Sequence, residues 1–239
     1  MTQVQHPPVT TVQPLGRPTA SLPESGGSRL SVAAGVLLVL SGATVLMGIV
    51  TAEALYPAAY NTHSQSVSDL AAMRPDNLVR QPSALIFNLT MIFAGLAIAV
   101  AAYLLHRARN ARRTTIPVAL LGLGMVGVGF FPGNLLAPHT LFSMIAFTAG
   151  GVGAITTARL HTGALRMLHT GLGIVSLTSL VVGGVFFVDW APVARLGEGG
   201  AERWVVYPVV LWIVTLGAAL ATGRSTNHPA EGVSQRGLS

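Results

Sequence analysis

Six apolar stretches of membrane-spanning length constrain this chain more than any other feature of its sequence. They cover residues 30–52, 83–105, 116–136, 140–158, 170–188 and 204–222. A helix needs about 20 apolar residues to cross a bilayer, and backbone in lipid must satisfy its own hydrogen bonds. The sequence therefore predicts an all-α polytopic membrane protein. We expect a bundle of six transmembrane helices over residues 30–222, with a long outward loop, residues 53–82, between helices 1 and 2.

The composition supports this class and excludes several kinds of chemistry. Of the 239 residues, 51% are hydrophobic and 9% are charged, whereas soluble domains carry about 25% charged residues. Cysteine is absent, which excludes disulfides, iron–sulfur clusters and thiolate metal sites. Every basic residue is arginine, so Schiff-base chemistry is excluded, and the arginine bias is typical of a bacterial protein. The basic residues lie between apolar spans, so no nucleic-acid partner is expected.

The distribution of arginines predicts the orientation in the cell membrane. Most of them fall in one set of segments, which we expect to be cytoplasmic, since positive charge is retained on that side. The run from His106 to Arg113 is the strongest anchor. Both termini are then cytoplasmic, and we expect disordered tails at residues 1–29 and 223–239, where no apolar periodicity is present.

Polar side chains gather near the expected outer ends of the spans, and ionisable groups close to a bilayer are candidates for a site. The ligand-binding candidates are Glu53, Tyr56, Asn88, Asn134, Ser143, Arg203 and Tyr207. The leading hypothesis is that this cluster binds a lipid or a small amphiphile, with Arg203 holding an anionic group through its planar fork. In the simpler alternative, Glu53 or Asp69 pairs with Arg203 only to pin the loop to the bundle.

Two further alternatives remain open. A membrane-embedded hydrolase or transferase would use His139 with Asp69 or Glu202, which are the catalytic candidates. No catalytic motif of fixed spacing accompanies them. A transporter is the third possibility. No charged residue lies in the middle of a span, which argues against ion transport and leaves transport of a neutral substrate open.

The remaining histidines and the small residues carry weaker signals. His106, His161 and His169 lie at cytoplasmic ends of spans, and two such histidines could ligate a b-type haem, but haem ligands usually lie deeper in the helices. The sequence therefore predicts no cofactor and no metal ion. Glycine and alanine are frequent in the later spans, where they allow close helix packing and could also support a homo-oligomer.

A succession of short motifs resembles a known family. The motifs are ALYPAAYNTHSQSVSDLAA from residue 54, IFN from 86, GVGFFPGN from 127, PHTLFSMIAF from 138 and GGAERWVVYPVVLW from 199. In this order they resemble the bacterial and archaeal membrane family called domain of unknown function 998, over roughly residues 30–222. The resemblance implies a membrane bundle of about six helices and no established activity. Its motifs contain Tyr56, Asp69, Asn88, His139 and Arg203.

Overall fold

A computed structural model describes residues 26–73, 76–108, 112–183 and 191–223 of the protein. Six of its helices are long and apolar enough to cross a membrane, which confirms the predicted multi-pass membrane class. They are α1 (Gly26–Ala54), α2 (Ser83–Arg107), α3 (Arg112–Phe130), α4 (Leu136–Ala158), α5 (Gly163–Val181) and α6 (Ala191–Ala221). A short 3-10 helix, η1 (Val67–Leu70), lies between α1 and α2. No strand is present in the described part of the chain.

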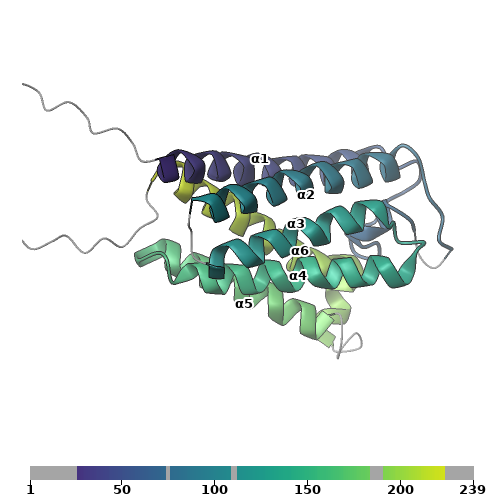
Figure 1. The fold of residues 1–239 in the computed structure, drawn as a ribbon. Coiled ribbons are helices and arrows are strands. Elements are labelled where there is room, and N and C mark those ends of the chain that lie inside the picture. The colour runs from purple at the N-terminus through teal and green to yellow at the C-terminus, as the bar shows by residue number, and fades with distance from the viewer. Residues whose placement is uncertain (1–25, 74–75, 109–111, 184–190, 224–239) are drawn as a thin grey trace, which may run out of the picture.

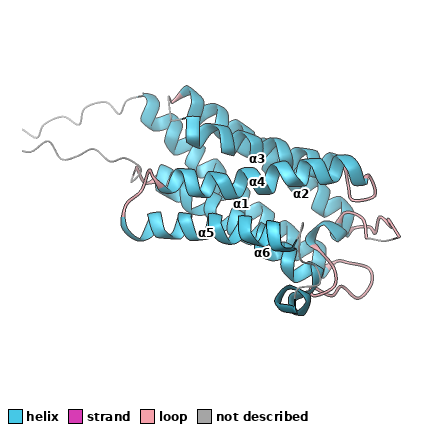
Figure 2. Ribbon diagram, turned by 90° about the horizontal axis from the view of Figure 1, so that it is seen from below, coloured by secondary structure: helices cyan, strands magenta, loops and turns pink. Residues whose placement is uncertain are grey.

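The six helices form one up-and-down bundle (Figure 1). Each helix packs against the next one along the chain, α6 returns to α1, and α4 also contacts α6. The first residues of α1 and the last residues of α6 lie at the same end of the bundle (Figure 1). Connections run only at the two ends, as Figure 2 shows. Short connections join α2 to α3, α3 to α4 and α4 to α5, as is usual for antiparallel neighbours.

Small residues set the closeness of this packing. Lipid tails are as apolar as leucine side chains, so helix association in a membrane depends on van der Waals contact between close backbones. A methyl group added at Gly35 in α1 would lie 2.5 Å from the carbonyl oxygen of Gly217 in α6. One added at Gly122 in α3 would lie 2.9 Å from the carbonyl oxygen of Gly95 in α2. These glycines therefore pack helices of one chain together, and the predicted homo-oligomer stays a prediction.

Several helix boundaries differ from the predicted spans. The span predicted at 116–136 is the helix α3, which begins at Arg112 and ends at Phe130, before the Pro132-Gly133 turn. The span predicted at 170–188 is α5, which begins seven residues earlier, at Gly163. Arg166 lies in its first turn and is exposed, so a charge near the bundle end does not stop the helix. Residues 184–188 of that prediction lie outside the described residues.

The last helix is also longer than predicted. A span was expected at 204–222, whereas α6 extends from Ala191 to Ala221 and contains one non-helical residue, Gly197, with φ 69°. At the other end of the chain, α1 begins at Gly26, within the segment expected to be a disordered tail. The rest of both predicted tails, residues 1–25 and 224–239, lies outside the described residues.

The expectation of a long loop between helices 1 and 2 is not supported. The residues between α1 and α2 fold back onto the bundle end as a compact segment, which we call the cap (residues 55–73 and 76–82). Within it, η1 forms, Met73 and Leu78 pair as an antiparallel bridge, and Val67, Leu70 and Ala71 are buried. A cap rather than an open loop forms because these apolar side chains are removed from water against the bundle.

The contact between α1 and α6 generates a stability prediction. In Gly217→Ala the new methyl group would lie 2.6 Å from the Gly35 carbonyl oxygen. Overpacking costs about 1–3 kcal/mol, which exceeds the gain of up to about 1 kcal/mol from replacing a helical glycine by alanine. We expect a lower thermal unfolding midpoint in detergent. In the matched control, Gly171→Ala, nothing lies within 4 Å of the new group, so its midpoint should not fall. Equal midpoints for the two variants would contradict this packing.

Candidate functional site

The cap is ordered first by its own short-range hydrogen bonds. Ser66 is the N-cap of η1, and its backbone N–H donates to the Asp69 carboxylate at 2.8 Å. The backbone N–H of Asp69 donates in return to the Ser66 hydroxyl at 3.3 Å. This reciprocal pair is a capping box, which satisfies two backbone donors that would otherwise be orphaned. Ser66 therefore caps this short helix, and the Asp69 carboxylate is part of that cap.

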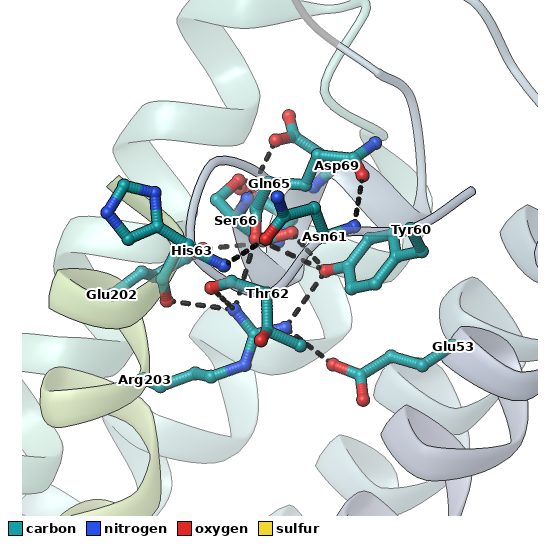
Figure 3. Close-up of polar contacts among 12 residues, drawn as sticks. Glu53, Tyr60, Asn61, Thr62, His63, Gln65, Ser66, Asp69, Glu202 and Arg203 are labelled. Atoms are coloured by element: carbon teal, nitrogen blue, oxygen red, sulfur yellow. Dashed lines mark hydrogen bonds and ion pairs between the residues drawn. The ribbon is translucent and has the colours of Figure 1, made fainter. Parts of the chain in front are cut away.

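Arg203 in α6 is the centre of a polar network between the cap and the bundle (Figure 3). Its Nη2 donates to the Glu53 carboxylate of α1 at 2.5 Å and to the Tyr60 hydroxyl at 3.0 Å. The guanidinium carbon lies 5.7 Å from the centre of the Tyr60 ring, within the range of a cation–π contact. The Tyr60 hydroxyl donates in turn to the Ser66 carbonyl oxygen at 2.7 Å.

The other terminal nitrogen of Arg203 binds backbone carbonyls. Nη1 donates to the carbonyl oxygens of Thr62 at 3.2 Å, Gln65 at 3.1 Å and Gly199 at 2.8 Å. A planar guanidinium can bind a carboxylate with one nitrogen and converging carbonyls with the other, which an ammonium group cannot match. Arg203 thus joins α1, the cap and the first part of α6.

Two glycines in α6 let the cap approach this closely. An added methyl group at Gly197 would collide with the carbonyl oxygen of His63, and one at Gly199 would collide with that of Gln65. The backbone N–H of Gly199 donates to the His63 carbonyl oxygen at 3.0 Å. Glycine is needed at 197 for a second reason, since its φ of 69° lies in the left-handed region.

The electrostatics of this network favour a structural role for Arg203. Burial raises the pKa of the Tyr60 phenol above its ordinary value of 10.0, more strongly than the Arg203 guanidinium lowers it. Tyr60 therefore stays neutral and keeps its proton for the Ser66 carbonyl. An anionic ligand at Arg203 would have to displace Glu53 or three carbonyls. The geometry thus agrees with the pinning alternative for Arg203 rather than with an anion clamp.

A cavity of about 70 Å³ lies inside the bundle directly below the cap. Its wall is largely aliphatic and aromatic, with four polar residues. The lining residues are Val45, Val67, Ser68, Phe87, Met91, Leu121, Met125, Val128, His139, Ser143, Ala146, Phe147, Glu202, Val206, Val209, Val210 and Ile213. They come from η1 and from every long helix except α5, so only the folded bundle creates the cavity.

The polar groups of the cavity lie at its cap end. Ser68 belongs to η1, and its backbone N–H donates to the Glu202 carboxylate at 3.3 Å. His139 is buried in the first turn of α4, where its Nδ1 lies 2.7 Å from the Phe131 carbonyl oxygen. A carbonyl only accepts, so Nδ1 of His139 carries a proton and donates it to the Phe131 carbonyl oxygen. Ser143 follows one helical turn later.

The structure thus brings together some of the predicted candidates and separates others. His139, Ser143 and Glu202 line the cavity, while Glu53 and Arg203 form the ion pair that holds the cap to the bundle. Tyr56 packs on Tyr60, with ring centres 5.2 Å apart. The others lie elsewhere: Asn88 is on α2 but is not a lining residue, Asn134 is exposed in the turn before α4, and Tyr207 lies on another face of α6, beside α5.

Sequence reasoning missed Tyr60, Gln65 and the glycines of α6 as members of the network. Tyr60 carried a usable signal, because an aromatic ring beside a charged cluster suits an arginine. Gln65 and Thr62 contribute backbone carbonyls, which no side-chain pattern reveals. The cavity wall was also missed, since residues such as Met91 and Met125 read only as part of an apolar span.

The histidines at the opposite end do not form a haem site. His161 and His169 are buried and pack edge to face, with ring centres 4.8 Å apart, which leaves no room for a macrocycle between them. Burial lowers the pKa of the His161 imidazole. His106 is exposed at the end of α2. No group of three or more metal-ligating side chains occurs among the described residues.

Comparison with known proteins gives one match. The sequence profile of the family described as "Protein of unknown function (DUF998)" matches residues 39–219. This range contains all six spanning helices apart from the ends of α1 and α6, together with the cap and the cavity. No curated protein and no solved structure matches the chain.

The Arg203 network generates a prediction about the cap. In Arg203→Gln the charged fork is lost, and hydrogen bonds to charged groups contribute about 1.5–3 kcal/mol, so we expect the cap to open about tenfold more often or more. The reporter is a cysteine at Ala71, a fully buried cap residue, in this cysteine-free chain. Its maleimide labelling rate should rise by that factor.

The matched control is Arg195→Gln, which removes an exposed arginine from the same helix. Its labelling rate should equal that of the Ala71→Cys parent. An unchanged rate in Arg203→Gln would show that the network does not hold the cap.

Proposed function

The chain belongs to the DUF998 family of unknown function, and we propose that this multi-pass membrane protein binds a small single-chain amphiphile in the cavity below its cap. The observation that carries the proposal is the cavity itself, which is apolar along its length and polar only at the cap end. This distribution matches a molecule with one hydrocarbon chain and one polar head.

The shape of the cavity supports a chain-like ligand. Glu202 and Ile213 both line it, and on a helix with a rise of 1.5 Å per residue they are about 16 Å apart along the axis. On α3, the lining residues Leu121 and Val128 are about 10 Å apart by the same measure. A space that is long relative to its volume of about 70 Å³ is narrow. It suits one hydrocarbon chain better than a ring system.

The volume of the cavity excludes ligands with two hydrocarbon chains. A cavity needs about 10–15 Å³ to hold one water molecule, so 70 Å³ corresponds to a file of about five or six. A cavity of about 150 Å³ is known to take up benzene, and this one has about half that volume, so the chain that it holds is short, with only a few carbons. A phospholipid with two chains does not fit such a space, so the general expectation of a lipid ligand narrows to a single chain.

The alternative enzyme proposal rests on the same cavity. The His139 imidazole and the Glu202 carboxylate line one space, as a hydrolase or transferase would require. Asp69 is the weaker partner for His139, because its carboxylate already accepts from the Ser66 N–H. Loss of a pH-dependent hydrolytic activity in His139→Ala would favour this alternative. Transport of a neutral substrate has no specific observation in its favour.

We further propose that the protein lies in the cell membrane with the cap outside. The described arginines Arg107, Arg112, Arg113, Arg159 and Arg166 lie at the bundle end opposite the cap, and positive charge is retained in the cytoplasm. A cysteine at Ser64, exposed in the cap, should react with an impermeant maleimide in intact cells. A cysteine at Thr162, exposed between α4 and α5, should react only after lysis. The opposite pattern would invert the orientation.

Filling the cavity tests the proposed function. Met125 lines it and is 8% exposed, whereas Leu123, two residues earlier on the same helix, is 52% exposed. Met125→Trp adds volume where the chain would lie, and Leu123→Trp adds the same ring on the outer surface. The probe is hexanol with a photoreactive diazirine in its chain, added to the protein in phosphatidylcholine nanodiscs.

We expect the probe to label cavity residues such as Met91 in the parent protein and in Leu123→Trp, as mapped by peptide mass spectrometry. Labelling of these residues should fall by about tenfold or more in Met125→Trp, because the site is occupied by the new side chain. Labelling of the exposed Phe93 is the internal reference for bulk lipid contact. Equal labelling of Met91 in both tryptophan variants would contradict binding in the cavity.

A further inference from the structure

The end of the bundle opposite the cap carries arginines, whereas the described acidic residues lie at the cap end. The exposed arginines at the end opposite the cap are Arg29, Arg107, Arg112, Arg113, Arg159 and Arg166. The described acidic residues are Glu53, Asp69, Asp76, Glu198 and Glu202. Like charges that are held close together repel one another, so this surface favours an anion supplied from outside the chain.

Arg113 and Arg159 emerge from neighbouring helix ends. Thr156, in the last turn of α4, donates from its hydroxyl to the Arg113 carbonyl oxygen at 3.1 Å, which holds the end of α4 against the start of α3. Arg159 follows Thr156 by three residues, and helical residues three apart lie on the same side. Both side chains are exposed, and neither has a carboxylate partner within the described residues. Two long side chains that start about one helical turn apart can reach the same anionic group.

The depth of this surface in the membrane indicates that the anion is a lipid head group. Tyr103 is 57% exposed near the end of α2, and tyrosine prefers the layer between hydrocarbon and water. Arg107, one turn further, donates from Nη1 to the Tyr103 hydroxyl at 3.3 Å. On α3, Ile116 is 53% exposed and follows Arg112 and Arg113 by one turn. Apolar surface for lipid tails therefore begins directly beside the arginines, which puts them at the depth of the phosphates.

The chemistry of the guanidinium group selects among head groups. Its planar fork donates two parallel hydrogen bonds to a phosphate, which makes arginine a preferred partner of phosphodiesters. In phosphatidylcholine the phosphate lies beside the quaternary ammonium of its own head group, which offsets its charge. A phospholipid with a net negative head group has no such compensation, so basic surfaces attract it more strongly.

We propose that the surface formed by the start of α3 and the end of α4 binds the phosphodiester head group of an anionic phospholipid, held by Arg113 and Arg159. Arg112 and Arg107 extend the same positive surface toward α2. This site lies at the opposite end of the bundle from the cap, so it is independent of the ligand proposed for the cavity. It is also independent of the orientation of the protein in the cell membrane.

The test compares two lipids at two positions of one helix. A single cysteine that carries a bimane fluorophore replaces Ile116 or Phe130 in this cysteine-free chain. Both residues are exposed on α3, at 53% and 62%, and they lie about 21 Å apart along its axis, at opposite ends of the bundle. The protein is placed in phosphatidylcholine nanodiscs with a rising fraction of phosphatidylglycerol or phosphatidylcholine brominated on its acyl chains. Quenching of each fluorophore by bromine gives the relative association of the two lipids at that position.

We expect phosphatidylglycerol to be preferred about tenfold at Ile116→Cys and not at Phe130→Cys. A basic residue near the membrane surface contributes about fivefold to the affinity for an anionic lipid, and salt at 0.15 M reduces the combined effect of two. In the double variant Arg113→Gln and Arg159→Gln, the preference at position 116 should fall to within about twofold. The matched control is Arg195→Gln, which removes an exposed arginine at the cap end and should leave the preference unchanged.

Three results would overturn the proposal. They are equal quenching by the two lipids at position 116, an equal preference at positions 116 and 130, and a preference retained in the double variant. A final measurement separates a lipid head group from free phosphate. Inorganic phosphate at 20 mM, added at constant ionic strength, should leave the preference at position 116 in place, whereas its loss would assign the surface to free phosphate instead.

Discussion

The Arg203 guanidinium is the interaction on which the cap end of this protein depends. It connects three segments that are far apart in the sequence: Glu53 at the end of α1, the carbonyls of the cap, and Gly199 in α6. A buried fork of donors is costly unless every partner is present, so it tolerates only one placement of the cap. That placement puts Val67 and Ser68 over the bundle and closes the cavity below them.

The class of the fold was readable from the sequence because lipid imposes one physical rule. An apolar stretch of spanning length must be a helix, and six such stretches predicted six helices, as found. The boundaries were harder to predict. α5 begins near Arg166, where an arginine at interface depth costs little, and the apolar part of α6 is preceded by a further helical segment that meets it at a kink at Gly197. The compact cap depends on tertiary contacts that no local pattern contains.

The site was predictable only in part. Polar residues at one end of the spans did gather at one end of the bundle, and the pairing of Glu53 with Arg203 was among the alternatives. Which of them converge depends on helix rotation. His139, Ser143 and Glu202 face the cavity, whereas Asn88 and Tyr207 lie on other faces of their helices. The structural role of Arg203 could not be predicted, because three of its partners are backbone carbonyls, which no side-chain pattern in the sequence reveals.

The cap, held by Arg203, closes a narrow apolar cavity, in which we propose that one hydrocarbon chain binds. The most direct test of this proposal is a native mass spectrum of the protein released from cell membranes in lipid nanodiscs. We predict one single-chain amphiphile bound per protein. A bare protein mass, or adducts of two-chain phospholipids alone, would contradict it.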